Sequence, residues 1–212
     1  MFGILCGLES EAKIARRIVD AHVACAAARP GKARELAREL VHSGIQGLIS
    51  FGVAGGLTPD LPIGALVIGT KVVSAKGSWP CDVAWSETFV QKLPHAVRGP
   101  VWGSETIVAT TAEKRALFEN SGSVIVDMES QCAAEVAAEA HIPLAVIRAV
   151  CDTAEMNVPP TVMLSIDETG RTSLLRTAAH ILRHPSELPD LLYMAGGIRR
   201  ALAFLKGSLS AF

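Results

Sequence analysis

The segment GLISFGVAGG (47–56) carries the pattern that decides the fold class. Its first part, GLISFGV (47–53), is a mainly apolar run, as expected for a strand buried on both faces of a parallel sheet. The glycines that follow would let a backbone approach a ligand closely, but a tight turn between a strand and a helix explains them equally well. The segment matches neither GxGxxG nor GxxxxGK[ST], so it indicates neither a dinucleotide site nor a P-loop.

Short apolar runs alternate with helical patterns on both sides of this segment. The other expected strands are GILCG (3–7), a weak strand at 22–27, ALVIGTKVV (65–73), VIVDM (124–128) and LAVIRAV (144–150). The expected helices are 11–19 with Ser10 as its cap, 32–41, the alanine-rich stretch between the last two strands, and the tail from 189. This alternation predicts an α/β fold of three layers, in which a mostly parallel central sheet has helices on both faces.

Two stretches fit the alternation less well. Residues 76–104, which include Trp79, Trp85 and several prolines, are expected to form a loop-rich excursion with one short helix. Residues 156–169, which include the Pro159-Pro160 pair, predict a mobile flap. Neither an internal repeat nor a linker interrupts the sequence, so we expect residues 1–212 to form one domain.

Composition excludes several classes of protein. Half of the residues are hydrophobic, 19% are charged and the formal net charge is −1, so no basic excess indicates a nucleic-acid partner. The first residues lack the basic segment of a signal peptide, and no apolar run is long enough for a transmembrane helix. Five cysteines without a CxxC pair favour buried thiols over a disulfide framework or a zinc site. We therefore expect a cytoplasmic protein.

The ends of the predicted strands supply the candidate site residues, because open parallel sheets bind ligands beyond the carboxyl ends of their strands. Acidic residues dominate these positions, and neither lysine nor arginine is expected among them. Glu11 follows the first strand, Glu129 follows the strand at 124–128, and Asp152 follows the strand at 144–150. Each acid alone is explained by helix capping or by the helix dipole. Three acids at three strand ends favour a site, since capping does not require that convergence.

Four motifs together resemble the nucleoside phosphorylase and nucleosidase superfamily, particularly its methylthioadenosine/S-adenosylhomocysteine nucleosidase branch. They are GILCGLESEA (3–12), SFGVAGGL (50–57), VDMESQCAAEVA (126–137) and IPLAVIRAVCDTA (142–154). Within the superfamily the sequence is most similar to the hopanoid-associated phosphorylases, or adenosylhopane nucleosidases. The compact stretch at 29–57 carries this likeness, since it reaches the glycine motif without the early β-hairpin of ordinary nucleosidases. The resemblance implies a nucleoside phosphorylase-like fold.

The resemblance also implies a reaction, the release of a purine base, such as adenine, from a nucleoside. Asp152 matches the acid that protonates or hydrogen-bonds N7 of the leaving purine. Glu129 matches the acid that binds the ribose hydroxyls, and Met128 matches the methionine that packs against the sugar. Glu11 matches the carboxylate that activates water, where phosphorylases usually carry an arginine for phosphate. An oxocarbenium-like transition state needs a proton for the base and a late nucleophile, so two carboxylates suffice without metal or cofactor.

Two departures from the nucleosidase pattern concern the walls of the implied site. The glycine motif commonly reads GSAGG, so Val53, followed by Ala54 and Gly55, removes the contact that a serine makes at the ribose end. Ile107, with Val108 beside it, falls where nucleosidases stack an aromatic ring on adenine. An aliphatic clamp on the purine is therefore expected. Apolar neighbours in the run AVIRAV are expected to favour a protonated acid at the end of that strand.

Other interpretations of the motifs remain open. Phosphorolysis would use Arg29 and Lys32, which flank the predicted start of a helix where phosphate can bind. A nucleoside-binding module without catalysis is a second alternative, although the intact set of acids disfavours it. A futalosine-type hydrolase would use similar chemistry on another substrate.

The likeness to the hopanoid enzymes implies a lipid-linked nucleoside as substrate and an apolar surface beside its ribose 5′ side. The sequence candidates for that surface are Trp79, Trp85, Val162, Met163, Leu164, Leu192, Tyr193 and Phe204. With Arg199 and Arg200 nearby, they predict peripheral, reversible membrane contact, although such residues more often belong to a core or a subunit interface. The resemblance also implies a homodimer.

Overall fold

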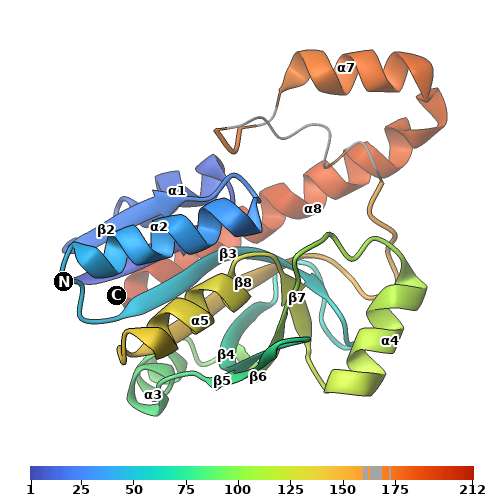
Figure 1. Ribbon diagram of the computed structural model, residues 1–212. Coiled ribbons are helices and arrows are strands. Elements are labelled where there is room, and N and C mark those ends of the chain that lie inside the picture. Colours follow the sequence, from blue (N-terminus) through green and yellow to red (C-terminus); the bar gives the residue numbers. More distant parts are fainter. Residues whose placement is uncertain (160–161, 163–168, 172) are drawn as a thin grey trace.

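The computed structural model describes residues 1–159, 162, 169–171 and 173–212. Figure 1 shows a central sheet between two layers of helices. Most of the predicted flap, including Pro160, Met163 and Leu164, lies outside the described residues. Within the described ranges, no helix has both the length and the apolar character that crossing a membrane requires.

The described part of the chain forms an eight-stranded sheet. The strands are β1 (Phe2–Cys6), β2 (Ala21–Cys25), β3 (Leu48–Gly56), β4 (Leu66–Ser74), β5 (Gly77–Pro80), β6 (Val97–Gly103), β7 (Ile125–Asp127) and β8 (Leu144–Asp152). Their order is β2-β1-β3-β7-β6-β4-β5, and β8 pairs with β3 and β4. Five of these eight pairings are parallel, whereas β3/β7, β4/β5 and β4/β8 are antiparallel. The prediction of a mostly parallel central sheet is confirmed.

Five strands form a closed ring of pairings. β3 pairs with β8, β8 with β4, β4 with β6, β6 with β7, and β7 returns to β3. The ring brings the ends of three strands together, because Gly55 of β3 lies opposite both Asp152 of β8 and Val126 of β7. Each strand of the ring is hydrogen-bonded along both edges, which holds these ends in place.

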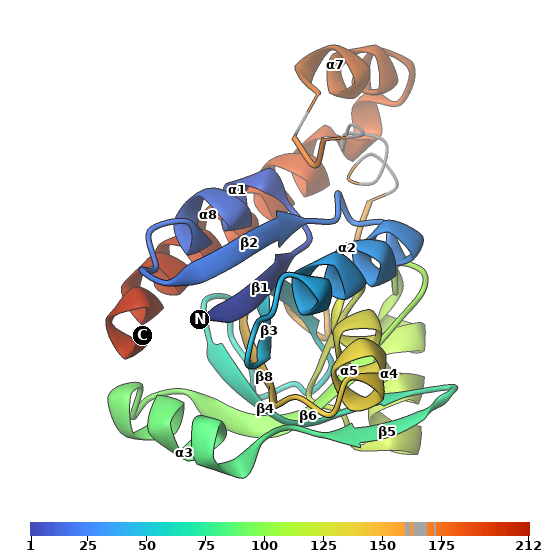
Figure 2. The same cartoon turned by 60° about the vertical axis from the view of Figure 1, so that its left-hand side comes forward.

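The helices cover both faces of the sheet, as predicted. They are α1 (Glu9–Ala15), α2 (Pro30–His42), α3 (Val83–Lys92), α4 (Thr111–Ser121), α5 (Ser130–Glu139), α7 (Leu174–Arg183) and α8 (Leu188–Gly207). One face packs against α1, α3 and α8 through side chains such as Ala12, Phe89 and Ala201. The other packs against α2 and α5 through Ala37 and Ala133. Figure 2 shows α1 and α8 on one side of β1 and β3, with α2 and α5 on the other.

The start of α1 differs from the prediction, and the difference shapes the site. The helix begins at Glu9, with Leu8 as the N-cap, so Ser10 lies inside the helix and is not its cap. Glu11 Oε2 accepts hydrogen bonds of 2.8 Å from the amides of Gly7 and Leu8, which precede the helix. Charge-assisted bonds of this kind are strong, so Glu11 ties the start of α1 to the end of β1.

Residues 76–104 are more regular than predicted. They contain α3 and also two strands, β5 and β6. Prolines masked the strand pattern, because proline lacks the amide proton that a strand normally donates. Pro80 ends the edge strand β5, and Pro100 in β6 still accepts a backbone hydrogen bond from Val124. Both tryptophans highlighted in this stretch pack inside the fold: Trp85 meets Phe2, and Trp79 lies against the core.

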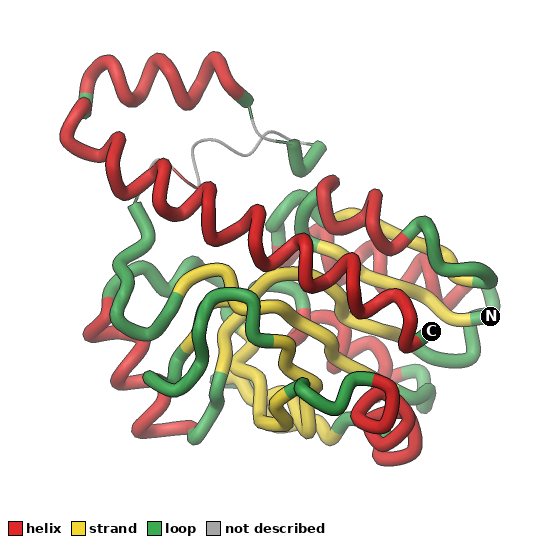
Figure 3. The backbone as a smooth tube through the Cα atoms, turned by 180° about the vertical axis from the view of Figure 1, so that it is seen from behind, coloured by secondary structure: helices red, strands yellow, loops and turns green. Residues whose placement is uncertain are grey.

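Helix α8 packs against β8 and β3, and in Figure 3, the view from behind, it crosses diagonally in front of the sheet. Its buried side is formed by Met194, Gly197, Ala201 and Leu205. Leu192, by contrast, is 63% exposed. Small residues decide which side faces the sheet, since a Cβ added at Gly197 would lie 2.2 Å from the carbonyl oxygen of Cys151.

Candidate active site

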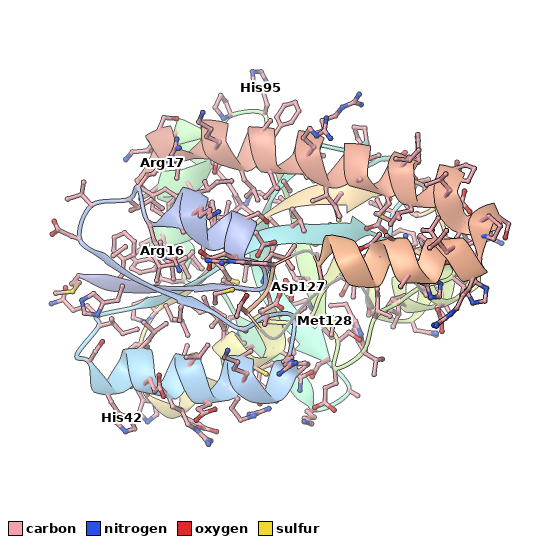
Figure 4. All side chains as sticks on the ribbon, turned by 90° about the horizontal axis from the view of Figure 1, so that it is seen from above. Arg16, Arg17, His42, His95, Asp127 and Met128 are labelled. Carbon is pink, nitrogen blue, oxygen red and sulfur yellow. The ribbon has the colours of Figure 1, made fainter. Side chains whose placement is uncertain are left out.

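A cavity of about 820 Å³ opens where β1, β3, β7 and β8 end. Its wall includes all nine residues that the sequence assigned to a site, namely Glu11, Val53, Ala54, Gly55, Ile107, Val108, Met128, Glu129 and Asp152. In Figure 4, Asp127 and Met128 lie between the red helix α8 and the blue helix α2. The structure thus brings these residues together, while their chemical roles stay predictions.

Glu11 is fully buried and holds three backbone amides at once. Its Oε2 accepts the two bonds from Gly7 and Leu8, in the first loop (the segment between β1 and α1). Its Oε1 accepts a 2.8 Å hydrogen bond from the amide of Val53 in β3. Burial raises the pKa of Glu11, although Arg148 and the three amides act in the opposite direction. The carboxyl group is therefore fixed in one orientation at the base of the cavity, with the first loop and the glycine segment bound to it.

Arg148, in the middle of β8, is a fully buried cation among the acids of the site. Its Nη2 lies 3.4 Å from Glu129 Oε2, its Nε lies 2.9 Å from Asp127 Oδ2, and Nη2 donates a 2.6 Å hydrogen bond to Ser50 Oγ. Burial raises the pKa of Glu129 to about 8, assisted by Asp127 and Glu11 and opposed by Arg148. Glu129 can therefore hold or release a proton near neutral pH.

Asp127 also lines the cavity, and both of its carboxylate oxygens are bonded to the turn that follows it. Its Oδ1 accepts hydrogen bonds from the amides of Glu129 (3.0 Å) and Ser130 (2.7 Å), and Oδ2 accepts from the hydroxyl of Ser130. These bonds shape the turn between β7 and α5 that presents Met128 and Glu129 to the cavity. Asp127, two residues before the N-cap Glu129, thus holds the start of α5 through its side chain.

Asp152 does not have the purely apolar surroundings that its strand predicted. Lys114 of α4, fully buried, contacts Asp152 Oδ2 through its ammonium group. Cys151 Sγ lies 3.1 Å from Oδ1 of the same carboxyl group. An ammonium in contact stabilises the charged form of a carboxyl group, whereas apolar neighbours would favour the protonated form.

The sequence did not predict the two buried cations that contact these acids, since neither lies at a strand end: Arg148 comes from the middle of β8 and Lys114 from α4. Arg148 could have been found from the sequence, because an arginine inside a buried apolar strand requires acidic partners. Lys114 gave no such signal, since it lies in a helix with many charged residues, TAEKRALFEN (111–120).

The outer part of the cavity is apolar. The segment after β6 contributes Ile107 and Val108, and the loop after β8 contributes Val158. Helix α8 contributes Leu191, Leu192, Met194, Ala195 and Ile198. Val162 also lines the cavity, as predicted for the apolar surface.

Several other residues proposed for the apolar surface lie elsewhere. Trp79, Trp85 and Tyr193 are not part of the cavity wall. Phe204 belongs to a separate groove of about 430 Å³ at the other end of α8, where it contacts Gly64. Arg29 and Lys32, the phosphate candidates, also lie outside the described wall of the large cavity, although Ala28 is part of it.

Solved structures of nucleosidases have the same fold. The 5′-methylthioadenosine/S-adenosylhomocysteine nucleosidase of Neisseria meningitidis, in complex with methylthio-immucillin-A, matches with a TM-score of 0.75 and 15% identity over 99% of this chain and 96% of that one. The futalosine hydrolase of Helicobacter pylori strain 26695 matches with a TM-score of 0.71 and 15% identity over 100% and 97%. The S-adenosylhomocysteine nucleosidase of Streptococcus pyogenes, in complex with 5-methylthiotubericidin, matches with a TM-score of 0.70 and 18% identity over 99% and 95%.

A family model identifies the chain more directly. The match to the model described as the Phosphorylase superfamily covers residues 23–183, which is more than half of the chain. The matched region runs from β2 to the end of α7, and it includes every residue assigned to the site except Glu11. The chain therefore belongs to the phosphorylase superfamily.

Proposed function

We propose that the protein is a purine nucleosidase, which breaks the N-glycosidic bond of a purine nucleoside with water. The proposal rests on two buried carboxyl groups, those of Glu11 and Asp152, which lie against β3 at positions two residues apart. Glu11 is bonded to the amide of Val53, and a Cβ at Gly55 would lie 3.1 Å from Asp152 Oδ2. Both acids line one cavity of about 820 Å³, which has room for a ribose ring and a water molecule.

The proposed reaction assigns one task to each group. The bond between C1′ and the purine nitrogen breaks, its electron pair goes to the base, and Asp152 delivers a proton to N7. Glu129 accepts hydrogen bonds from the ribose hydroxyls while Met128 packs against the sugar. Water then adds to C1′ and gives its proton to Glu11. Burial of all three acids keeps these interactions strong, because screening by solvent is weak.

Water is favoured over phosphate by the charges around the cavity. Glu11 occupies the position from which an attacking phosphate would be repelled. Arg148 is engaged by Asp127, Glu129 and Ser50. The cations in the described wall, Lys13 and Arg171, are exposed to solvent.

The nucleophile is tested by incubating the protein with adenosine derivatives, with and without phosphate. Free base and free sugar in phosphate-free buffer are the expected products. A sugar 1-phosphate, formed only with phosphate, would replace this proposal by phosphorolysis. Tight nucleoside binding without base release would instead indicate a binding module.

The apolar outer part of the cavity supports a nucleoside with a large apolar 5′ substituent, for which adenosylhopane is our proposed substrate. Helix α8 lines this part with Leu191, Met194 and Ile198. A volume of about 820 Å³ is also near the upper end of the range for small-molecule sites. Competition between adenosylhopane and methylthioadenosine is the test. Equal or better turnover of methylthioadenosine would replace the lipid proposal by an ordinary nucleosidase, and preference for futalosine would indicate the futalosine-type alternative.

Delivery of such a substrate predicts peripheral contact with lipid. Leu192 and Tyr193 are exposed on α8 beside the cavity, and Arg199 and Arg200 are exposed further along the helix. Co-sedimentation with liposomes that contain anionic lipid tests this contact. The implied homodimer is a separate prediction, which sedimentation equilibrium of the purified protein checks.

A further inference from the structure

Lys114 is a fully buried lysine whose three donors are all used. Its Nζ contacts Asp152 Oδ2 and donates 2.8 Å hydrogen bonds to the carbonyl oxygens of Thr153 and Met156. Burial of an ammonium group costs free energy unless it is paired and hydrogen-bonded. Helix packing alone does not call for a charge at this position, since Lys114 is the only residue of α4 whose side chain is buried.

The three contacts give each proton of the Lys114 ammonium group a different acceptor. Two of its protons point to backbone carbonyls, and the third points to the carboxyl group that faces the cavity. A neutral amine has two protons and one lone pair. Lys114 can therefore give up the proton shared with Asp152 and still keep its bonds to Thr153 and Met156.

We propose that Lys114 is a positioning residue and proton reservoir for the leaving base, acting through Asp152. The inference rests on the proposed nucleosidase function. As the C1′–N bond breaks, Asp152 transfers a proton to the base nitrogen that receives the electron pair. The proton between Lys114 and Asp152 moves to the carboxylate, and Lys114 becomes a neutral amine. Water gives its proton to Glu11 as it adds to C1′, and exchange with solvent after product release returns both groups to their starting states.

Lys114 and Asp152 together carry no net charge until the base has received its proton. Asp152 alone would carry a buried negative charge beside an electron-rich leaving group. With Lys114, the pair begins neutral and becomes negative only after it has protonated the base. Lys114 does not line the cavity, so its effect reaches the substrate through the carboxyl group.

The test compares two leaving groups in the variant Lys114→Gln. A purine needs a proton to depart, whereas 4-nitrophenolate departs as an anion from 4-nitrophenyl riboside. We expect kcat for a purine nucleoside to fall about 10²–10⁴-fold, the range of general acid catalysis. We expect the kcat for 4-nitrophenyl riboside and the KM for the nucleoside to change only a few-fold. Glutamine can still donate to a backbone carbonyl, and Arg115→Gln, at the exposed neighbouring position, is the matched control.

Equal losses on both substrates would reduce Lys114 to a structural role, and an unchanged rate with purine would also overturn the proposal. The wild-type protein provides a second readout that does not depend on a variant folding. Its rate of purine release should fall in D₂O, because protons move as the bond breaks, whereas cleavage of 4-nitrophenyl riboside should show a smaller solvent isotope effect. An identical fall for both substrates contradicts the proposal. A wild-type protein that releases no base from any purine nucleoside refutes the proposed function instead.

Discussion

Glu11 and Val53 are 42 residues apart in the sequence, and Glu11 Oε1 accepts a 2.8 Å hydrogen bond from the amide of Val53. The bond joins the first turn of α1 to the glycine segment of β3. Two further bonds, from Gly7 and Leu8, hold the other carboxylate oxygen. Glu11, which is proposed to activate water, therefore also holds together the two segments of the cavity wall beside it.

The variant Glu11→Gln should abolish base release in phosphate-free buffer, because an amide cannot accept the proton of the attacking water. It should also lower the stability, since the NH₂ group of glutamine cannot accept the bonds that Oε1 or Oε2 accept now. A buried amide without its partner costs about 1–3 kcal/mol. Base release followed by chromatography measures the first effect, and thermal unfolding the second. Activity of the variant near the wild-type value would refute the assignment.

The variant Asp152→Asn should lose most turnover while it keeps the fold. Its amide oxygen can still accept a hydrogen bond from Lys114, which limits the structural effect, but it has no proton to give to the purine. The expected loss in kcat is about 10²–10⁴-fold. Circular dichroism verifies the fold. A rate within a few-fold of wild type would show that Asp152 is not the acid.

The raised pKa of Glu129, about 8, predicts how stability depends on pH. Above its ordinary value of 4.5, the unfolded chain loses the proton of Glu129 while the folded protein keeps it until about pH 8. The unfolded state then binds fewer protons, so the free energy of unfolding falls as pH rises across this window. Glu129→Gln removes the ionisation and should flatten the decline of the melting temperature between pH 5 and 8. Groups that do not interact with Glu129 contribute equally to the curves of the wild type and the variant, so parallel curves would contradict the prediction.

The contact between α8 and β8 predicts opposite effects at two neighbouring glycines. A Cβ at Gly197 would lie 2.2 Å from the carbonyl oxygen of Cys151, so Gly197→Ala must displace α8 from β8. We expect a lower melting temperature and slower base release, because Asp152 follows Cys151 directly. Gly196, where an added Cβ meets nothing within 4 Å, is the matched control. Gly196→Ala should leave activity unchanged and stabilise the helix by up to about 1 kcal/mol. Equal effects of the two substitutions would contradict the packing described.

Substitutions at Leu192 and Tyr193 can distinguish contact with the substrate from mere exposure to solvent. Both are 63% exposed, but only Leu192 of the two lines the cavity. Leu192→Ser should raise KM for adenosines with long apolar 5′ substituents by roughly tenfold, the equivalent of about 1.4 kcal/mol of apolar contact, and leave KM for adenosine itself unchanged. Tyr193→Ser should change neither value. Equal KM changes for both nucleosides would argue against a 5′ site on α8.

The cavity wall was predictable where the ends of buried strands carry acids or glycines. Glu11, Glu129 and Asp152 each follow a run whose apolar character marks it as a strand, and parallel pairing forces such ends together. Arg148 carried a readable signal as well, in a run of buried apolar residues. Lys114 did not, because its burial depends on how α4 lies against the end of β8, a contact between segments 38 residues apart.

Local patterns also failed where residue type alone was misleading. Ser10 is a good N-cap by residue type, but α1 begins at Glu9 with Leu8 as its N-cap, so Ser10 lies inside the helix. Strand β6 contains Pro100, which has no amide proton to donate, but its carbonyl oxygen still accepts a hydrogen bond from the amide of Val124.

The closed ring of β3, β8, β4, β6 and β7 separates two kinds of change that evolution can make in this protein. Gly55, Asp152 and Val126 belong to strands of the ring, so a substitution that moves one of them disturbs backbone ladders on both sides. The apolar residues on α8 are bound only by side-chain packing, and they can be exchanged one at a time. A lineage can therefore alter one surface helix, and with it the apolar end of the cavity, while it inherits intact the acids proposed to break the bond.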